Sequence, residues 1–285
     1  MNCFFVSDLH GQIYRYQRLT ERIISDRPAA VFIGGDLLPH QHFSQNAYKN
    51  HLDFTEQYLI PHFKEVKNVL KKDYPRIFVI LGNDDSRLTE KLLLSATETR
   101  LWNYIHNRKV TFNNYLIVGY ACVPPTPFIL KDWEKYDISR YIDPGCIPPE
   151  EGYHSIPISL EEKKFDTIQK DLDKLTEDSD TNLMLFLFHS PPYRTKLDRA
   201  ESDRQKIDHV PLEPHIGSVA IRKFIERKQP LVTLHGHAHE STRLTGLWRD
   251  RIGHTYCFNA AHDGAELALI RFNPQNLEDA QRELI

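Results

Sequence analysis

Short apolar runs recur along the chain, and each ends at a glycine, a serine or a polar side chain. Runs of this kind, bounded by turn residues, are typical of buried strands. The runs cover residues 2–6, 29–33, 76–81, 183–188 and 231–234, and a longer strand-like stretch covers residues 110–121. We therefore predict a strand at each of these positions.

Apolar residues at helical spacing fill several intervals between these strands. The predicted helices run from Ile13 towards Pro28, over residues 40–73, from a Ser159 cap to Leu175, and over residues 218–228. Pro61 should kink the second segment or start a new helix, because proline suits the first turn of a helix and not its interior. Ser159 and Glu162 have the spacing of a capping box. Strands that alternate with helices indicate an α/β fold with functional residues at the strand ends.

No repeat or break in composition divides the chain. We expect one domain over residues 1–273, with two long irregular connections at about 122–158 and 190–215, and a polar or helical tail at 274–285. Residues 251–272 suggest a β-meander or hairpin. A long irregular segment inside a compact domain is usually a binding loop or a lid, which we expect for residues 122–158.

Composition narrows the class of protein. With 285 residues, 40% of them hydrophobic and 26% charged, the chain is typical of an ordinary globular protein, and its net charge of −3 gives no reason to expect nucleic acid as a partner. Its four cysteines show no CxxC spacing and are expected to be reduced. No apolar run spans a bilayer and the start of the chain lacks a signal-peptide pattern, so we expect a cytoplasmic protein without membrane contacts.

Ligand-type side chains follow five of the predicted strands. Two of these ends carry a pair two residues apart, which face the same way on a strand. The candidates are Asp8, His10, Asp36, Asn83, His189, His237 and His239. Gly236 lets the backbone approach whatever the last pair holds. Carboxylate, amide and imidazole ligands without a thiolate suit Mn²⁺, Fe, Zn²⁺, Ni²⁺ or Co²⁺.

These residues occur in a recognisable order of motifs: DLH at 8–10, GGD at 34–36, GND at 82–84, a single histidine at 189 and GHAH at 236–239. The set resembles the calcineurin-like metallophosphoesterase family, whose pattern is DxH, GD, GNH followed by Asp or Glu, a lone histidine and GHxH. The resemblance implies two packed mixed β-sheets flanked by helices, a four-layer α/β/β/α sandwich.

The resemblance also implies a binuclear centre. One divalent ion would be held by Asp8, His10 and His239, the other by Asn83, His189 and His237, and Asp36 would bridge both. Two ions of this kind, with manganese as one choice, can present a bridging hydroxide to phosphorus. The expected activity is hydrolysis of a small-molecule phosphoric ester, with a phosphodiester favoured over a monoester.

Asp84 departs from the family pattern, because it stands where the family has the histidine of GNH, a residue thought to assist the leaving group. Two nearby cations should lower the pKa of a carboxylate, so Asp84 is a poor proton donor. It could hold a metal-bound water, orient another group or act as an extra ligand. Otherwise a residue of 122–158, such as His154, donates the proton, or the leaving group needs little protonation.

Two rival functions stay open. The Asp84 replacement is compatible with a metal-stabilised binding or scaffold protein that has weak or lost catalysis. A nuclease would need a basic groove, which the composition does not indicate. Candidate contacts to substrate are Lys131, Trp133 and Tyr141 in the first long connection and Arg194, Lys196 and Arg199 in the second, with Asn259 helping to close the site. His235 is expected to be structural, and the remaining histidines are expected at the surface or in packing.

Overall fold

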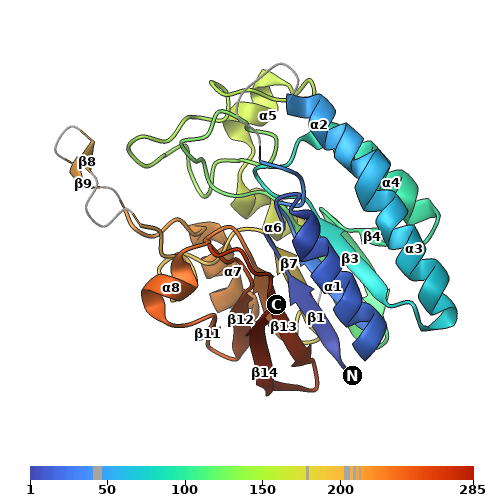
Figure 1. Cartoon of the computed structure of the whole chain (residues 1–285). Helices are drawn as coiled ribbons and strands as arrows, with labels where there is room; N and C mark the ends of the chain where they lie inside the picture. The colour runs from blue at the N-terminus through green and yellow to red at the C-terminus, as the bar shows by residue number, and fades with distance from the viewer. Residues whose placement is uncertain (41–46, 178–179, 202–205, 208–209, 212) are drawn as a thin grey trace.

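The structure is a computed structural model that describes residues 1–40, 47–177, 180–201, 206–207, 210–211 and 213–285 (Figure 1). Two mixed sheets of six strands each lie face to face, with helices on their outer faces. This arrangement confirms the α/β fold class and the two packed mixed β-sheets that the motifs imply.

The first sheet has the strand order β14-β13-β1-β2-β3-β4. Its strands are β1 (Cys3–Val6), β2 (Ala30–Gly34), β3 (Arg76–Ile80), β4 (Asn103–Tyr104), β13 (Ala268–Asn273) and β14 (Asn276–Leu284). Strands β1 to β4 run parallel to one another. At one edge β13 pairs antiparallel with β1, and β14 pairs antiparallel with β13. The carboxyl ends of β1, β2 and β3 therefore lie side by side at one end of the sheet.

The second sheet has the order β11-β12-β10-β7-β6-β5. Its strands are β5 (Arg108–Phe112), β6 (Tyr115–Tyr120), β7 (Met184–Phe188), β10 (Val232–His235), β11 (Arg249–Ile252) and β12 (Thr255–Asn259). The four central strands are parallel and both edge strands are antiparallel. A short hairpin of β8 (Lys206–Ile207) and β9 (Val210–Pro211) lies outside both sheets.

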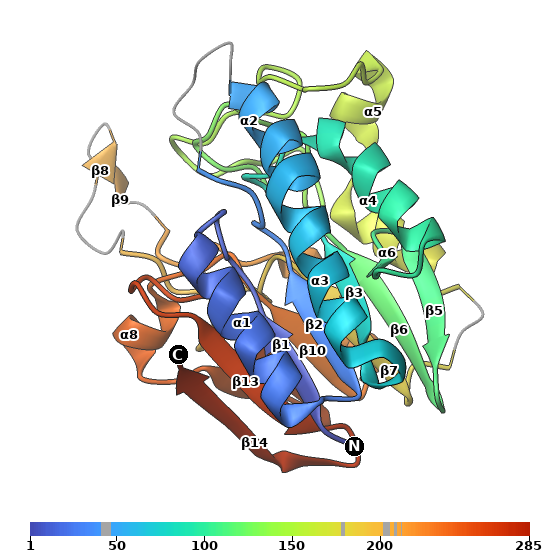
Figure 2. The same ribbon diagram turned by 45° about the vertical axis from the view of Figure 1, so that its right-hand side comes forward.

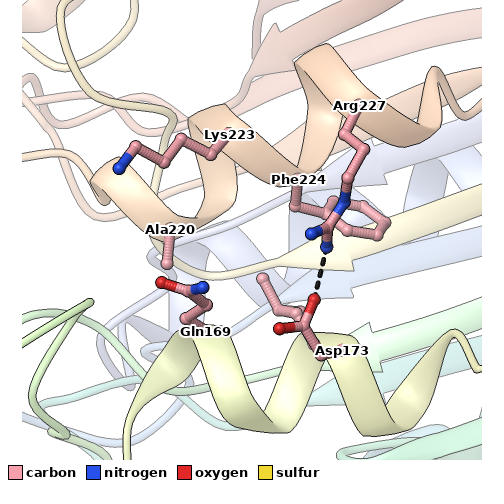
Figure 3. A pocket seen from close by; sticks show the side chains of 7 residues that line it. Gln169, Asp173, Ala220, Lys223, Phe224 and Arg227 are labelled. Atoms are coloured by element: carbon pink, nitrogen blue, oxygen red, sulfur yellow. Dashed lines mark hydrogen bonds and ion pairs between the residues drawn. The ribbon is translucent and has the colours of Figure 1, made fainter.

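Helices form the two outer layers. The first sheet is covered by α1 (Ile13–Asp26), α3 (Ile60–Leu70) and α4 (Glu90–Glu98), and α2 (Ala47–Phe54) continues into α3 through the π-helical turn η1 (Thr55–Leu59) (Figure 2). The second sheet is covered by α6 (Ile168–Leu175) and α7 (Val219–Lys228). These two helices border a cleft of about 120 Å³. Figure 3 shows Arg227 of α7 paired with Asp173 of α6 at this cleft. The remaining short elements are η2 (Lys71–Asp73), η3 (Arg87–Thr89), α5 (Leu160–Phe165) and α8 (Ser241–Thr245).

A row of phenylalanine rings holds the two sheets together. Phe32 stacks on Phe78 with ring centroids 5.2 Å apart, and the row continues to Phe112 of the second sheet on one side and through Phe272 to Phe258 of the second sheet on the other. All five rings are buried. Each contributes roughly 1.5–3 kcal/mol through burial, so the contact between the sheets is a substantial part of the hydrophobic core.

The irregular segment 122–158 is tied to the rest of the fold. Its Asp137 carboxylate accepts hydrogen bonds from the Val219 and Ala220 N–H groups at the start of α7, and Asp132 accepts from the Arg87 N–H at 2.7 Å. In both views this segment, coloured green to yellow, lies at the end of the molecule opposite the N-terminus (Figures 1 and 2). That is the end at which β1 finishes.

Three expectations about the elements need correction. Residues 276–284 are not a tail but the edge strand β14. Residues 251–272 do not form one meander, because β13 leaves β11 and β12 and joins the first sheet. The helix expected from Ser159 to Leu175 is two helices that break at Asp166, with Thr167 capping the second. In the segment 40–73, α3 does begin at the turn that contains Pro61, but residues 41–46 lie outside the described residues. The helix α4 was not predicted.

The burial of β14 predicts a stability difference between two of its leucines. Leu277 is 5% exposed against the core, whereas Leu284 is 46% exposed. Leu277→Ala should lower the free energy of unfolding by about 2–4 kcal/mol because it leaves a cavity, and Leu284→Ala should change it by less than about 0.5 kcal/mol. Urea denaturation measures both. Equal and small effects would mean that residues 274–285 are the loose tail after all.

Candidate metal centre

The seven predicted ligands come from the carboxyl ends of five strands. Asp8 and His10 follow β1, Asp36 follows β2 and Asn83 follows β3, all in the first sheet. The three histidines follow strands of the second sheet: His189 follows β7, and His237 and His239 follow β10. The structure brings all seven to the place where the ends of the two sheets meet.

Four of them form one tight group. The ligand atoms of Asp8, His10, Asp36 and His239 all lie within 4.8 Å of one another. His239 Nε2 is 2.9 Å from Asp8 Oδ1 and 3.1 Å from His10 Nε2. His10 Nε2 is 3.9 Å from Asp36 Oδ2. Two imidazole nitrogens and two carboxylates therefore point at one small volume.

The other three lie on the far side of Asp36. His189 Nε2 is 3.3 Å from Asp36 Oδ2 and 3.1 Å from Asn83 Oδ1. The His189 ring packs edge-on against the His237 ring, with centroids 5.3 Å apart. The same Asp36 oxygen is thus close to a histidine from each group.

The donor set fits a metal better than it fits an ordinary hydrogen-bond network. His189 Nδ1 donates to the Gly34 carbonyl at 2.8 Å, so in the neutral ring the Nε2 lone pair faces two oxygen acceptors, on Asp36 and Asn83. That arrangement is repulsive unless a proton or a cation lies between them. The backbone bond to Nδ1 is also how proteins orient a metal-ligating imidazole. A divalent ion held by nitrogen and oxygen would satisfy these atoms.

Several of these residues adopt a backbone conformation that is rare for side-chain-bearing residues. Asp8, His10, Asp36 and His237 have φ of 58°, 48°, 50° and 68°. A residue held in the left-handed region costs roughly 1–3 kcal/mol in unfavourable cases and is found at functional sites. Four such residues among seven candidate ligands indicate that the loops are shaped to aim side chains and not to maximise local stability.

Two glycines allow the loops to come this close. A Cβ at Gly82 would lie 2.3 Å from Asp36 Oδ1, and one at Gly236 would lie 2.5 Å from Asp8 Oδ2. Any side chain at either position would push a carboxylate out of the group. The GND and GHAH motifs therefore require glycine at these positions because there is no room for a side chain.

Two residues that brace the site were not predicted. The buried Asp85 carboxylate accepts hydrogen bonds from the N–H groups of Leu37, Leu38 and Gly82, at 3.0, 2.8 and 2.9 Å. His51 donates through Nε2 to the Pro39 carbonyl and accepts through Nδ1 from the Ser86 N–H. Both side chains join the loop after β2 to the loop after β3. Asp85 stands at the acidic position that follows GNH in the family pattern, but that pattern does not state its role, and no motif marks His51. Both roles depend on backbone geometry.

The buried carboxylates and imidazoles of the centre shift one another's pKa values. Burial lowers the pKa of His189, but the Asp36 carboxylate outweighs it and raises that pKa to about 9. Burial also opposes ionisation of Asp8, yet His239 beside it leaves the Asp8 pKa below its ordinary value. The pKa of Asp36 is lowered in the same way: burial is overcome by His189. Both carboxylates are therefore ionised at neutral pH, as metal ligands must be.

Asp84 lies at the rim of this group. Its backbone N–H donates to Asp36 Oδ1 at 2.9 Å, and its Oδ2 accepts from His40 Nδ1 at 2.5 Å. The same oxygen is 3.5 Å from His10 Nδ1. The His40 ring stacks on the His10 ring, with centroids 3.8 Å apart and planes 16° apart. His40 was expected at the surface or in packing, and its place beside the centre is a feature that the sequence did not reveal.

Other candidates lie elsewhere or have structural partners. His154 lines a separate cavity of about 100 Å³ together with Arg87, His106 and Trp133. Lys131 is buried and pairs with Glu134, and Trp133 is buried, whereas Tyr141 is exposed. A contact between any of these three and a substrate stays a prediction.

Several candidates in the second long connection and near β10 and β12 also have structural partners. Arg194 pairs with Glu213 at 3.7 Å. Asn259 donates to the Leu197 and Ala238 carbonyls, so it braces the loop after β10. Both ring nitrogens of buried His235 have partners, the Ser190 carbonyl and the Thr233 hydroxyl, which agrees with a structural role. Roles for Lys196 and Arg199 at phosphate stay predictions.

Comparison with known proteins identifies the family. The model of the calcineurin-like phosphoesterases matches residues 1–241, which is most of the chain and includes every predicted ligand. The chain belongs to the calcineurin-like phosphoesterase family. No curated protein sequence matches it significantly. The family uses divalent metal ions, and the group of aspartate and histidine side chains described above could hold one.

Solved structures agree with the calcineurin-like phosphoesterase fold. The protein TT1561 of Thermus thermophilus superposes with a TM-score of 0.55 at 14% identity, over 99% of this chain and 98% of that one. A dimetal phosphatase from Danio rerio superposes with a TM-score of 0.51 at 11% identity, over 100% of this chain and 95% of that one. At such low identity these matches support the fold alone.

Two further findings concern the cysteines and the helices. All four cysteines are free thiols, as the sequence predicted. Among the described residues, no helix combines the length and apolar character needed to cross a membrane.

The raised pKa of His189 predicts that metal binding releases protons. At pH 7 the metal-free ring, with a pKa of about 9, carries a proton that it must lose to act as a ligand. Apparent affinity should therefore rise about tenfold per pH unit from pH 7 and level off near pH 9. Calorimetric titration with Mn²⁺ in two buffers of different ionisation enthalpy measures the release, and His189→Gln should release about one proton fewer. A binding enthalpy that is the same in both buffers would contradict the prediction.

Proposed function

We propose that this chain hydrolyses phosphoric esters with the help of two divalent transition-metal ions, and that phosphodiesters are its preferred class. The observation that supports this most is the position of one Asp36 oxygen, 3.9 Å from His10 Nε2 and 3.3 Å from His189 Nε2. A single carboxylate placed between two imidazole groups is suited to bridge two ions.

The ligand assignment follows the two groups in space. Asp8, His10 and His239 would hold one ion, Asn83, His189 and His237 would hold the other, and Asp36 would lie between them. Ions in these places would lower the pKa of a water molecule and neutralise charge on the phosphoryl group. Mn²⁺, Fe, Zn²⁺, Ni²⁺ and Co²⁺ all suit this set of nitrogen and oxygen ligands.

The protein's own groups orient these ligands. The Asp84 N–H bonds to Asp36 Oδ1, which directs the second oxygen, Oδ2, between the two histidines. The His237 N–H donates to both oxygens of Asp8, at 3.1 and 3.2 Å. Each buried carboxylate is thereby held in one orientation before any ion or ester arrives, and preorganisation of this kind is what hydrolysis by positioned charge requires.

Local charge favours a diester over a monoester. Within the described part of the chain, none of the seven side chains forms an ion pair with a lysine or an arginine, and the nearby Arg15 is bound to the carbonyls of Asp8 and Gly264. The extra negative charge of a monoester would therefore meet no lysine or arginine held against the ligands and would have to be neutralised mainly by the ions. A diester, which carries one charge at neutral pH, makes a smaller demand.

A metal-stabilised scaffold is the second candidate, because Asp84 replaces the histidine of the family pattern. Purified protein loaded with Mn²⁺, and then with each of the other metals, should be assayed on bis(4-nitrophenyl) phosphate and on 4-nitrophenyl phosphate. Release of nitrophenol from the diester supports the hydrolase. A protein that binds metal but cleaves neither ester with any of them supports the scaffold.

Removal of the bridging carboxylate provides the sharpest single test of the hydrolase. Asp36→Asn should reduce diester hydrolysis by about 10³-fold or more and should lower bound metal to less than one ion per chain, because an amide cannot supply the negative charge between two cations. Metal content after gel filtration and steady-state rates measure the two effects. The exposed Asp73→Asn is the matched control and should change neither. Normal turnover by Asp36→Asn would refute the bridging role.

A further inference from the structure

The outermost imidazole of the centre belongs to His40. Its side chain is 63% exposed, whereas that of His10, on which it stacks, is 3% exposed. Asp84, whose side chain is 30% exposed, accepts a hydrogen bond from His40 Nδ1 at 2.5 Å. The three side chains form a cluster whose nitrogen and oxygen atoms lie within 4.8 Å of one another, at the open side of the candidate metal centre.

This contact differs from an ordinary surface ion pair because the two loops that carry it are cross-linked. The Asp84 N–H bonds to Asp36, four residues before His40, and the Asp85 carboxylate bonds to the Leu37 and Leu38 N–H groups. His51 bonds to the Pro39 carbonyl, directly before His40, and to the Ser86 N–H, two residues after Asp84. An exposed pair on flexible side chains contributes little, but here the backbones on both sides are fixed.

The cluster also has a defined orientation. The Asp84 carboxylate uses Nδ1 of His40, and the His10 ring covers one face of the imidazole. Within the described residues, Nε2 of His40 has no hydrogen-bond partner. A carboxylate on one ring nitrogen sets the direction of the other, so Nε2 is the nitrogen available to a molecule bound at the centre.

We propose that His40 is a catalytic residue that contacts the departing ester oxygen through Nε2, and that Asp84 is its positioning residue. This inference rests on the proposed function. A carboxylate at position 84 would be a poor proton donor beside two cations, yet it is well suited to hold an imidazole. The loop after β2 thus supplies the imidazole that the GND motif lacks, and the loop after β3 supplies its carboxylate.

The step balances as follows. The oxygen of water forms a bond to phosphorus while the bond from phosphorus to the ester oxygen breaks, and the departing oxygen keeps the electron pair. Because Nδ1–H is donated to Asp84, the His40 ring offers a proton at Nε2 only in its imidazolium form. That Nε2–H hydrogen-bonds to the departing oxygen and passes it the proton to give the free alcohol, which leaves a neutral imidazole. Water loses one proton to solvent, and the imidazole recovers one from solvent, so the overall reaction consumes one ester and one water.

The expected signature is a dependence on the leaving group. A basic departing oxygen, such as that of phenol, needs the contact much more than nitrophenolate does. With Mn²⁺-loaded protein, His40→Ala should lower kcat for methyl phenyl phosphate by about 100-fold and for methyl 4-nitrophenyl phosphate by less than about tenfold. Asp84→Asn should show the same pattern with smaller losses, and the double variant should be no slower than His40→Ala.

Controls separate this role from metal binding and from folding. His254→Ala, a change at an exposed histidine on the turn between β11 and β12, should match the parent on both esters. Bound metal and the melting temperature should be unchanged in all variants. Loss of metal from His40→Ala or Asp84→Asn would show that these residues are ligands and would overturn the proposal. Equal losses on both esters, or additive losses in the double variant, would overturn it as well.

A binding measurement keeps the inference distinct from the proposed function. Inorganic phosphate presents an oxygen in each position around phosphorus, including that of the departing group. His40→Ala should weaken phosphate binding to the Mn²⁺-loaded protein by about tenfold in calorimetric titration, and His254→Ala should not. If the parent cleaves neither ester, the proposed function fails, and a selective loss of phosphate affinity still supports the contact at His40. Equal affinity in parent and His40→Ala overturns the contact.

Discussion

Two carboxylates, those of Asp8 and Asp36, are buried side by side where the ends of the two sheets meet. Burying a carboxylate is costly unless a positive charge or several donors accompany it. In the metal-free protein His189, whose pKa is raised to about 9 by Asp36, provides that charge, and the His239 imidazole lies against Asp8, which raises the His239 pKa. This constraint explains why histidines from the second sheet are directed at carboxylates from the first, and why the same atoms are suited to divalent ions.

The local backbone is arranged to serve this junction. Left-handed conformations at Asp8 and Asp36 are unfavourable in isolation, and they persist because neighbouring hydrogen bonds define the loops. Asp85 and His51 supply such bonds between the loops after β2 and β3. The same bonds that hold the ligands also set His40 beside Asp84.

The strands, and the aspartate, asparagine and histidine side chains that follow them, could be predicted because their sequence signals are local. A parallel strand buried on both faces appears as a continuous apolar run, and residues such as Asp36 and His189 follow such runs directly. The edge strand β14 could not be predicted, since its sequence NLEDAQREL places only scattered apolar residues among charges. His40 and His51 escaped notice because their roles depend on contacts between loops that are distant in sequence. The break between α5 and α6 at Asp166 could not be predicted, because no proline or glycine marks it in the sequence.

The division of the candidate ligands between the sheets has a wider consequence. Asp8, Asp36 and Asn83 belong to one layer of the sandwich and the histidines at 189, 237 and 239 to the other, so an ion held at the centre acts as a cross-link between layers. The ion would bind tightly only while the layers are docked, and its binding energy would be added to the unfolding free energy of the whole sandwich. For this protein, the melting temperature would then rise with the concentration of free metal ion.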